Sequence, residues 1–269
     1  MPASRKATRK KKTTRKPAAE KQKLGATKAA AWTLQRAMTA LERAGTAQNR
    51  KIYARHGVSG DAFGVSYAAL AKLEKAIKTD HALAMQLWAT GKHDARVLAT
   101  MIADPAKLRA ADLDRMAKDV DNPVLTGAFA NLAGDSPHAP SRIAAWVKAK
   151  PAPASELIIA AGYSTASANL TKRRKAKPDP ATDLPDSLLS DLLDRIEKTI
   201  HDMPNRARES MNICLISIGA YRESLRNRAL GVAKSIGKVD VDHGQTGCKT
   251  PDAAAYIAKT VERNSRVPR

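Results

Sequence analysis

The sequence has few aromatic residues and few cysteines. Only 4% of its 269 residues are Phe, Trp or Tyr, whereas 43% are hydrophobic, and much of that share is Ala. Because Ala loses no side-chain entropy in a helix, this composition favours helices over sheets. The two cysteines, Cys214 and Cys248, exclude a disulfide framework and indicate a reducing compartment.

Long apolar runs are also missing. No stretch of apolar residues reaches the length that a membrane span needs, and the N-terminus lacks the apolar core of a secretory signal. We therefore expect no membrane association and a cytoplasmic, nucleoid-associated protein. A mitochondrial presequence is the alternative for the basic N-terminus, although residues 5–16 carry almost no apolar face.

Acidic residues are scarce in two segments, which carry most of the net charge of +21. Residues 1–28 contribute +10 and residues 172–177 contribute +5, which leaves +6 for the remainder. Residues 1–28 contain few apolar side chains that could be buried on folding, so we expect a disordered arm that binds polyanions. A solubilising tail is the alternative. The arm's candidate DNA contacts are Lys10, Lys11, Lys12, Arg15 and Lys16.

The remaining chain, residues 29–265, predicts an all-α domain. About twelve short amphipathic helices alternate with Gly, Pro, Ser and Asp punctuation, as in the apolar stripe of Leu189, Leu192 and Ile196. No stretch predicts a strand. Stacked helix pairs of this kind indicate a HEAT-like α-α superhelix. Residues 155–165 predict a short helix, and a loop or linker is expected at about 166–183, where basic residues and prolines accumulate.

Four groups of residues, in this order, resemble the DNA alkylation repair family, whose relatives are HEAT-like alkylpurine DNA glycosylases. The groups are RKIYARHG (50–57) with FGVS (63–66); LWATGKHDARVLA (87–99); PNR (204–206) with MN (211–212) and IG (218–219); and GKVDVDHG (237–244) with CKTPDA (248–253). The resemblance implies a concave basic surface that engages double-stranded DNA, alkylated DNA included, and excision of N3- or N7-alkylated purines.

The family's key catalytic feature is a Trp followed four residues later by an Asp, which this chain lacks. Pro123 and Gly127 stand at the matching positions, no Arg occurs in residues 155–162, and no aromatic residue stands at Met211 or Asn212. A carboxylate would stabilise the developing positive charge of the sugar. The nearest substitutes are Asp119 and Asp121, for which capping of the helix after Asn122 is the alternative role.

Further DNA contacts are expected on the folded part. Basic residues around an aromatic are typical of nucleic-acid surfaces, although Tyr53 could equally be core, and Arg96 could equally be an ion-paired structural residue. Trp88 and Trp146 are expected in the core. Thr250 starts a helix whose N-terminus attracts anions. The candidates are Arg50, Lys51, Tyr53, Arg55, Arg96, Lys172, Arg173, Arg174, Lys249 and Thr250.

No cofactor or metal is expected. Asp240, Asp242, His243 and Cys248 lie close together in the sequence, but their spacing matches no zinc pattern. The function predicted from the resemblance is DNA binding with base excision as its possible activity. The alternatives are a non-catalytic nucleic-acid binder, RNA included, and a protein-interaction scaffold, whose sign would be an apolar groove instead of a basic one.

Overall fold

The computed structural model describes residues 31–173 and 182–266, and within them the chain is all-α, as predicted. The only β feature in these two ranges is an isolated bridge between Gly45 and Val65. The helices are α1 (Leu34–Ala44), α2 (Ala47–Arg55), α3 (Tyr67–Ile77), α4 (His81–Ala89), α5 (His93–Ile102), α6 (Ala110–Asp119), α7 (Pro123–Ala133), α8 (Ala139–Trp146), α9 (Glu156–Arg173), α10 (Asp186–Thr199), α11 (Asn205–Tyr221), α12 (Arg226–Ile236) and α13 (Ala253–Ser265). Four short 3-10 helices are η1 (Pro105–Lys107), η2 (Pro153–Ser155), η3 (Ile200–Asp202) and η4 (Glu223–Leu225).

Side-chain caps set where many of these helices begin. Thr46 accepts a hydrogen bond from the backbone N–H of Asn49, and Ser66 accepts one from the backbone N–H of Ala69. Asn122 caps α7 in the same way through the backbone N–H of Leu125. Each cap satisfies a backbone donor that the helix itself leaves without a partner.

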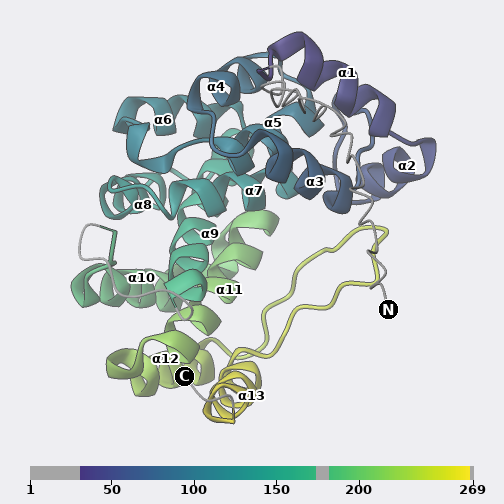
Figure 1. The fold of residues 1–269 in the computed structure, drawn as a ribbon. Coiled ribbons are helices and arrows are strands. Elements are labelled where there is room, and N and C mark those ends of the chain that lie inside the picture. Colours follow the sequence, from purple (N-terminus) through teal and green to yellow (C-terminus); the bar gives the residue numbers. More distant parts are fainter. Residues whose placement is uncertain (1–30, 174–181, 267–269) are drawn as a thin grey trace, which may run out of the picture. The chain divides into compact units, whose positions relative to one another are not determined.

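The helices form two layers. Helices α5, α7, α9, α11 and α13 pack on one another in that order, and α4, α6, α8, α10 and α12 pack outside them (Figure 1). Each odd-numbered helix of this series thus contacts an outer neighbour and the next inner helix. This arrangement is the predicted HEAT-like stack of helix pairs.

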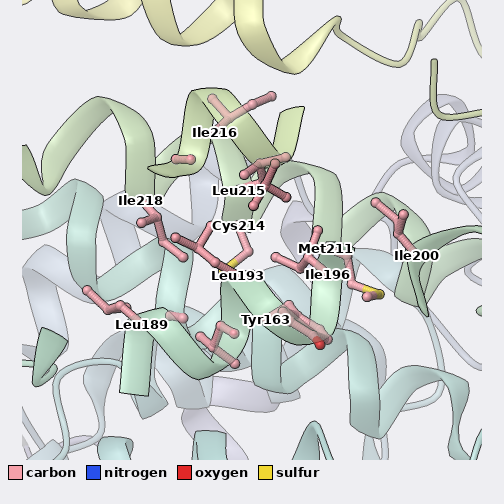
Figure 2. Packing of buried hydrophobic residues seen from close by; sticks show 14 of the residues in the cluster. Tyr163, Leu189, Leu193, Ile196, Ile200, Met211, Cys214, Leu215, Ile216 and Ile218 are labelled. Atoms are coloured by element: carbon pink, nitrogen blue, oxygen red, sulfur yellow. The ribbon is translucent and has the colours of Figure 1, made fainter. Parts of the chain in front are cut away.

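The core consists of two apolar clusters. The first, in the N-terminal half, contains the neighbouring rings of Trp88, Phe129 and Trp146. Both tryptophans are therefore core residues, as predicted, and α6 holds their indoles: Trp88 Nε1 donates to Asp119 and Trp146 Nε1 donates to Asp114, each at 2.9 Å. The second cluster joins α9 to α10, α11, α12 and α13, and Figure 2 shows Tyr163 among side chains of α10 and α11.

Helix α9 corrects the predicted loop at about 166–183. It continues without a break to Arg173, and residues 174–181 lie outside the described ranges. Helix α9 lacks a polar face opposite an apolar one because α7, α8 and α11 pack around it. Buried polar residues also hold α9 in place: Asn169 donates to the carbonyls of Gly134 and Thr182.

The loop before α3 is fixed by a buried carboxylate. Asp94, in the first turn of α5, is fully buried and accepts hydrogen bonds from the backbone N–H groups of Phe63, Gly64 and Val65 at 2.6, 3.2 and 2.7 Å. The hydroxyl of Tyr53 donates to the carbonyl of Val65. Gly64 has φ +80°, and a Cβ there would lie 2.5 Å from the carbonyl oxygen of Thr46. Hydrogen bonds therefore connect this loop to Tyr53 of α2 and to Asp94 of α5.

Replacing Asp94 by Ala should lower the free energy of unfolding by about 3 kcal/mol, because three backbone donors would be left buried without acceptors. Urea unfolding followed by circular dichroism measures the change. The matched control is Asp191→Ala, an exposed residue of α10 with no partner among the described residues, which should change stability by less than about 0.5 kcal/mol. Equal effects of the two variants would contradict the role assigned to Asp94.

Candidate nucleic-acid interface

A cleft of about 290 Å³ lies where the inner helices begin. Its wall is built by the first turns of α7, by α9 and α11, by the end of α2, and by the segment between α12 and α13. The lining residues are His56, Pro123, Val124, Thr126, Gly127, Leu157, Ala160, Ser164, Arg206, Glu209, Ser210, Ile213, His243, Thr246 and Cys248.

Several of the positions that correspond to the missing family signature line this cleft, whereas Met211 and Asn212 are buried and do not. Pro123 and Gly127 line one side, and Leu157 and Ala160, from the stretch without an Arg, line another. An added Cβ at Gly127 would have no atom within 4 Å, so open space stands where the family resemblance places an Asp. The positions at which the resemblance places an Asp and an Arg therefore line this cleft with other residues.

The charged residues of the cleft are connected. Arg206 donates to Oε2 of Glu209 at 2.9 Å, and Nδ1 of His243 lies 3.6 Å from Oε1 of the same carboxylate. Nε2 of His243 lies 3.0 Å from the hydroxyl of Thr250. Among the described lining residues Glu209 is the only carboxylate, and its charge is balanced by Arg206.

The segment between α12 and α13, residues 237–252, forms a long irregular loop that leaves α12 and returns to α13 (Figure 1). Asn205 holds it through two hydrogen bonds, donating to the carbonyl of Asp242 at 2.7 Å and accepting from its N–H at 2.8 Å. Arg208 donates to the carbonyl of Asp240, and Asn212 donates to that of Pro251. These contacts with α11 place His243, Thr246 and Cys248 in the wall of the cleft.

The electrostatics of the cleft favour an anion. Residues at the start of α7, α9 and α11 line it, and the N-terminus of a helix carries partial positive charge. Arg55 follows one turn after Lys51 on α2 and precedes the lining residue His56, and Lys249 follows the lining residue Cys248. All three cations are exposed and have no ion pair with any described residue. Phosphate groups of a nucleic acid would be attracted to these unpaired cations, which adjoin two elements of the cleft wall.

The carboxylates predicted as substitutes lie elsewhere. Asp119 binds the indole of Trp88, and Asp121 accepts a hydrogen bond from the amide of Asn122 at 2.7 Å. Neither lines the cleft. Asn122 provides the cap of α7, and Asp121 stands beside it, so both aspartates have structural partners instead of access to the site. Their catalytic role stays a prediction.

Two predicted DNA contacts are corrected by burial. The ring of Tyr53 packs edge-on against His93, and the residue is only 8% exposed because its hydroxyl is used inside the fold. Burial, with a smaller effect of Asp94, raises the pKa of Tyr53. Arg96 donates to the carbonyl of Asp119 at 2.7 Å and lies over the ring of Trp88, which makes it a structural arginine.

The other predicted contacts divide into three groups. Lys51, Arg55 and Lys249 are exposed, as is Arg50, although the guanidinium of Arg50 donates to the carbonyl of Phe63. Lys172 pairs with Asp135, and Thr250 contacts His243, while the cap of the last helix is Asp252. The described residues do not include Lys10, Lys11, Lys12, Arg15, Lys16, Arg174 or the side chain of Arg173.

Arg206 and Glu209 were not among the residues predicted for the site, although Arg206 belongs to the PNR group that carries the family resemblance. Glu209 follows Arg206 by three residues, which places both on one face of α11. For metals, no group of three or more His, Cys, Asp or Glu side chains in the described ranges is arranged to hold an ion. No helix within these ranges has the length and apolar character of a membrane span.

Comparison with known proteins identifies relatives of the chain. Residues 37–151 match the family described as DNA alkylation repair enzyme. An uncharacterized protein of Listeria innocua is 29% identical over 220 residues, which is 79% of this chain and 90% of that protein. An uncharacterized protein of Listeria monocytogenes shows the same identity over the same length, with the same coverage of both chains.

One solved structure has a similar fold and is described as "A new family of proteins related to the HEAT-like repeat DNA glycosylases with affinity for branched DNA structures". Its TM-score is 0.75 at 29% sequence identity, and the similarity covers 86% of this chain and 95% of that one. The resemblance predicted from the four residue groups is thereby confirmed.

The two cysteines should differ in reactivity in the folded protein. Burial raises the pKa of Cys214 to about 12, so its thiolate is scarce at pH 8 and reagent cannot reach the sulfur. Cys248 is exposed in the cleft wall. Titration with a disulfide reagent at pH 8 should modify one thiol in the native protein and two in urea. Cys248→Ser should abolish the native reaction, whereas rapid modification of both native thiols would contradict the burial of Cys214.

Proposed function

We propose that this relative of the DNA alkylation repair enzymes binds DNA at the face that contains the cleft, and that branched DNA is its preferred form. The observation that supports the proposal most directly is that Arg55 and Lys249 adjoin the lining residues His56 and Cys248, are exposed, and have no ion pair with a described residue. The described relative with affinity for branched DNA has the same fold over nearly all of its length. Double-stranded DNA, alkylated DNA included, is the wider ligand class.

The protein-interaction alternative requires a large apolar groove on this face. Among the described residues, the exposed large hydrophobic side chains are Ile52, Tyr67, Ile213 and Tyr256, and of these only Ile213 lines the cleft. Apolar side chains provide most of the surface of the cleft, and its polar groups are hydroxyls, imidazoles and the Arg206–Glu209 pair. These polar and charged groups, together with the neighbouring cations Arg55 and Lys249, favour a nucleic acid over a purely hydrophobic protein segment.

Charge reversal at the two flanking cations tests the proposal. In the chain without residues 1–28, Arg55→Glu together with Lys249→Glu should weaken binding to a three-way junction and reduce its salt dependence by about 2 in log–log slope, because each lost phosphate contact removes about 1. Fluorescence anisotropy at several salt concentrations measures both quantities. Use of the truncated chain removes the contribution of the basic arm.

The matched control reverses two lysines of the outer layer. Lys148 and Lys198 line a separate cleft between α8 and α10, so Lys148→Glu together with Lys198→Glu changes the net charge equally on the other layer. This control should leave the slope unchanged to within the experimental error. Equal losses in both double variants, or no junction binding by the truncated chain, would contradict the proposed face.

Excision of alkylated purines is the second candidate, because Glu209 places a carboxylate in the cleft. Its pairing with Arg206 reduces its capacity to stabilise a cationic sugar, and no Trp, Tyr or Phe lines the cleft beside it. We therefore expect DNA binding without release of 7-methylguanine above the spontaneous rate.

Base release from DNA that carries 7-methylguanine, measured with protein in excess, tests this expectation. Excess protein ensures that binding does not limit the reaction. Release that exceeds the spontaneous rate and is lost in Glu209→Gln would establish excision and assign the carboxylate to it. Glu197 is an exposed residue of α10 that does not line the cleft, so Glu197→Gln should leave any release unchanged and controls for a contaminating activity.

A further inference from the structure

We propose that the cleft receives one unpaired nucleobase from the branch point of bound DNA. This inference rests on the proposed function and assigns a ligand to the cleft itself. It follows from the size of the cleft, the chemistry of its walls and the cations at its margins.

The cleft has room for one base and not for a duplex. Its volume of about 290 Å³ lies at the lower end of the range for small-molecule sites. Part of this room exists because residue 127 has no side chain: nothing lies within 4 Å of a Cβ built there. A paired duplex can touch only the margin of such a cleft, whereas a single base outside the stack can enter it.

The walls suit a flat heteroaromatic ring with polar edges. Val124 and Leu157 provide apolar surface from α7 and α9, and Ile213 of α11 is 40% exposed on the cleft wall, which is unusual for a large aliphatic side chain. Apolar side chains of this kind pack on the faces of an extruded base. The exposed apolar surface of Ile213 would be covered by such a ring.

Polar groups stand where the edge of a base needs them. Ser164 donates to Ser210 at 3.2 Å, so the hydroxyl of Ser210 can donate to a further acceptor while both oxygens can still accept. Oε1 of Glu209 is 3.6 Å from His243, beyond hydrogen-bond distance, and can accept from an amino group of a base. The cleft thus offers both kinds of hydrogen-bond partner.

The cations fix where the backbone of the nucleotide would run. Arg55 and Lys249 adjoin lining residues of the cleft on two different elements, and residues at the start of α7 and α11 line it. The phosphates on either side of the inserted base would lie among these positive charges. A branch point supplies an unpaired base without the cost of breaking a pair, which explains why branched DNA would be favoured over duplex.

Two glycines make a matched pair of variants. Gly127 lies inside α7 and Gly231 lies inside α12, both are exposed, and a Cβ at either has no atom within 4 Å. Gly127→Phe fills the cleft, and Gly231→Phe adds the same side chain to an open helix surface away from it. Since Gly is unfavourable inside a helix, neither variant should lower the thermal midpoint of unfolding.

The test compares the affinity of the full chain for three junctions of one sequence. These are a fully paired three-way junction, the same junction with one unpaired base at the branch, and the latter with an abasic residue in place of that base. The wild-type protein should bind the unpaired-base junction about tenfold more tightly than the abasic one, because an abasic residue cannot make the contacts of the inserted base. Gly127→Phe should lose this preference, and Gly231→Phe should keep it.

The outcomes separate the inference from the proposed function. Equal binding of all three junctions by the wild-type protein would overturn base insertion while leaving DNA binding intact. A preference for the unpaired base that survives Gly127→Phe would also overturn it, because the base would then be bound elsewhere. Absence of binding to any junction would refute the proposed function itself and the inference with it.

Discussion

The close packing of α9 against α7, α8 and α11 is the constraint on which the inner layer depends. Gly162 allows α9 to approach α8, since a Cβ there would lie 2.8 Å from a methyl carbon of Val147. Gly134, after α7, allows a similar approach to α9 near Thr165 and Asn169. Because these contacts are tight, the inner helices keep a fixed spacing, and the residues at their beginnings come together around one cleft.

Polar contacts then set the parts of the cleft that are not helical. Asp94 holds the loop between α2 and α3 in place, and so holds the end of α2, which is followed by His56. Asn205 fixes the loop that carries His243. Asp94 and Asn205 both bond to backbone groups, so the position of each loop does not depend on the side chains of the loop. These side chains can therefore change while the loops keep their positions.

The helices that have one apolar face could be predicted from the sequence, as for α10 with its stripe of Leu189, Leu192 and Ile196. The full length of α9 could not be predicted, because a helix surrounded on several sides has no separate apolar and polar faces. The carboxylates nearest in sequence to the lost signature, Asp119 and Asp121, have structural partners, whereas Glu209 comes from a helix 82 residues beyond Gly127. Spacing along the chain cannot reveal such a convergence.

Gly127 has a consequence for the evolution of the site. Most positions of the inner layer are held by tight packing, so a larger residue there would compromise the fold. At residue 127 a side chain meets open space, and the helix gains stability when glycine is replaced. Selection can therefore change the contents of the cleft at this position without a loss of stability. Relatives with different ligands can arise from one backbone by substitutions at this single residue.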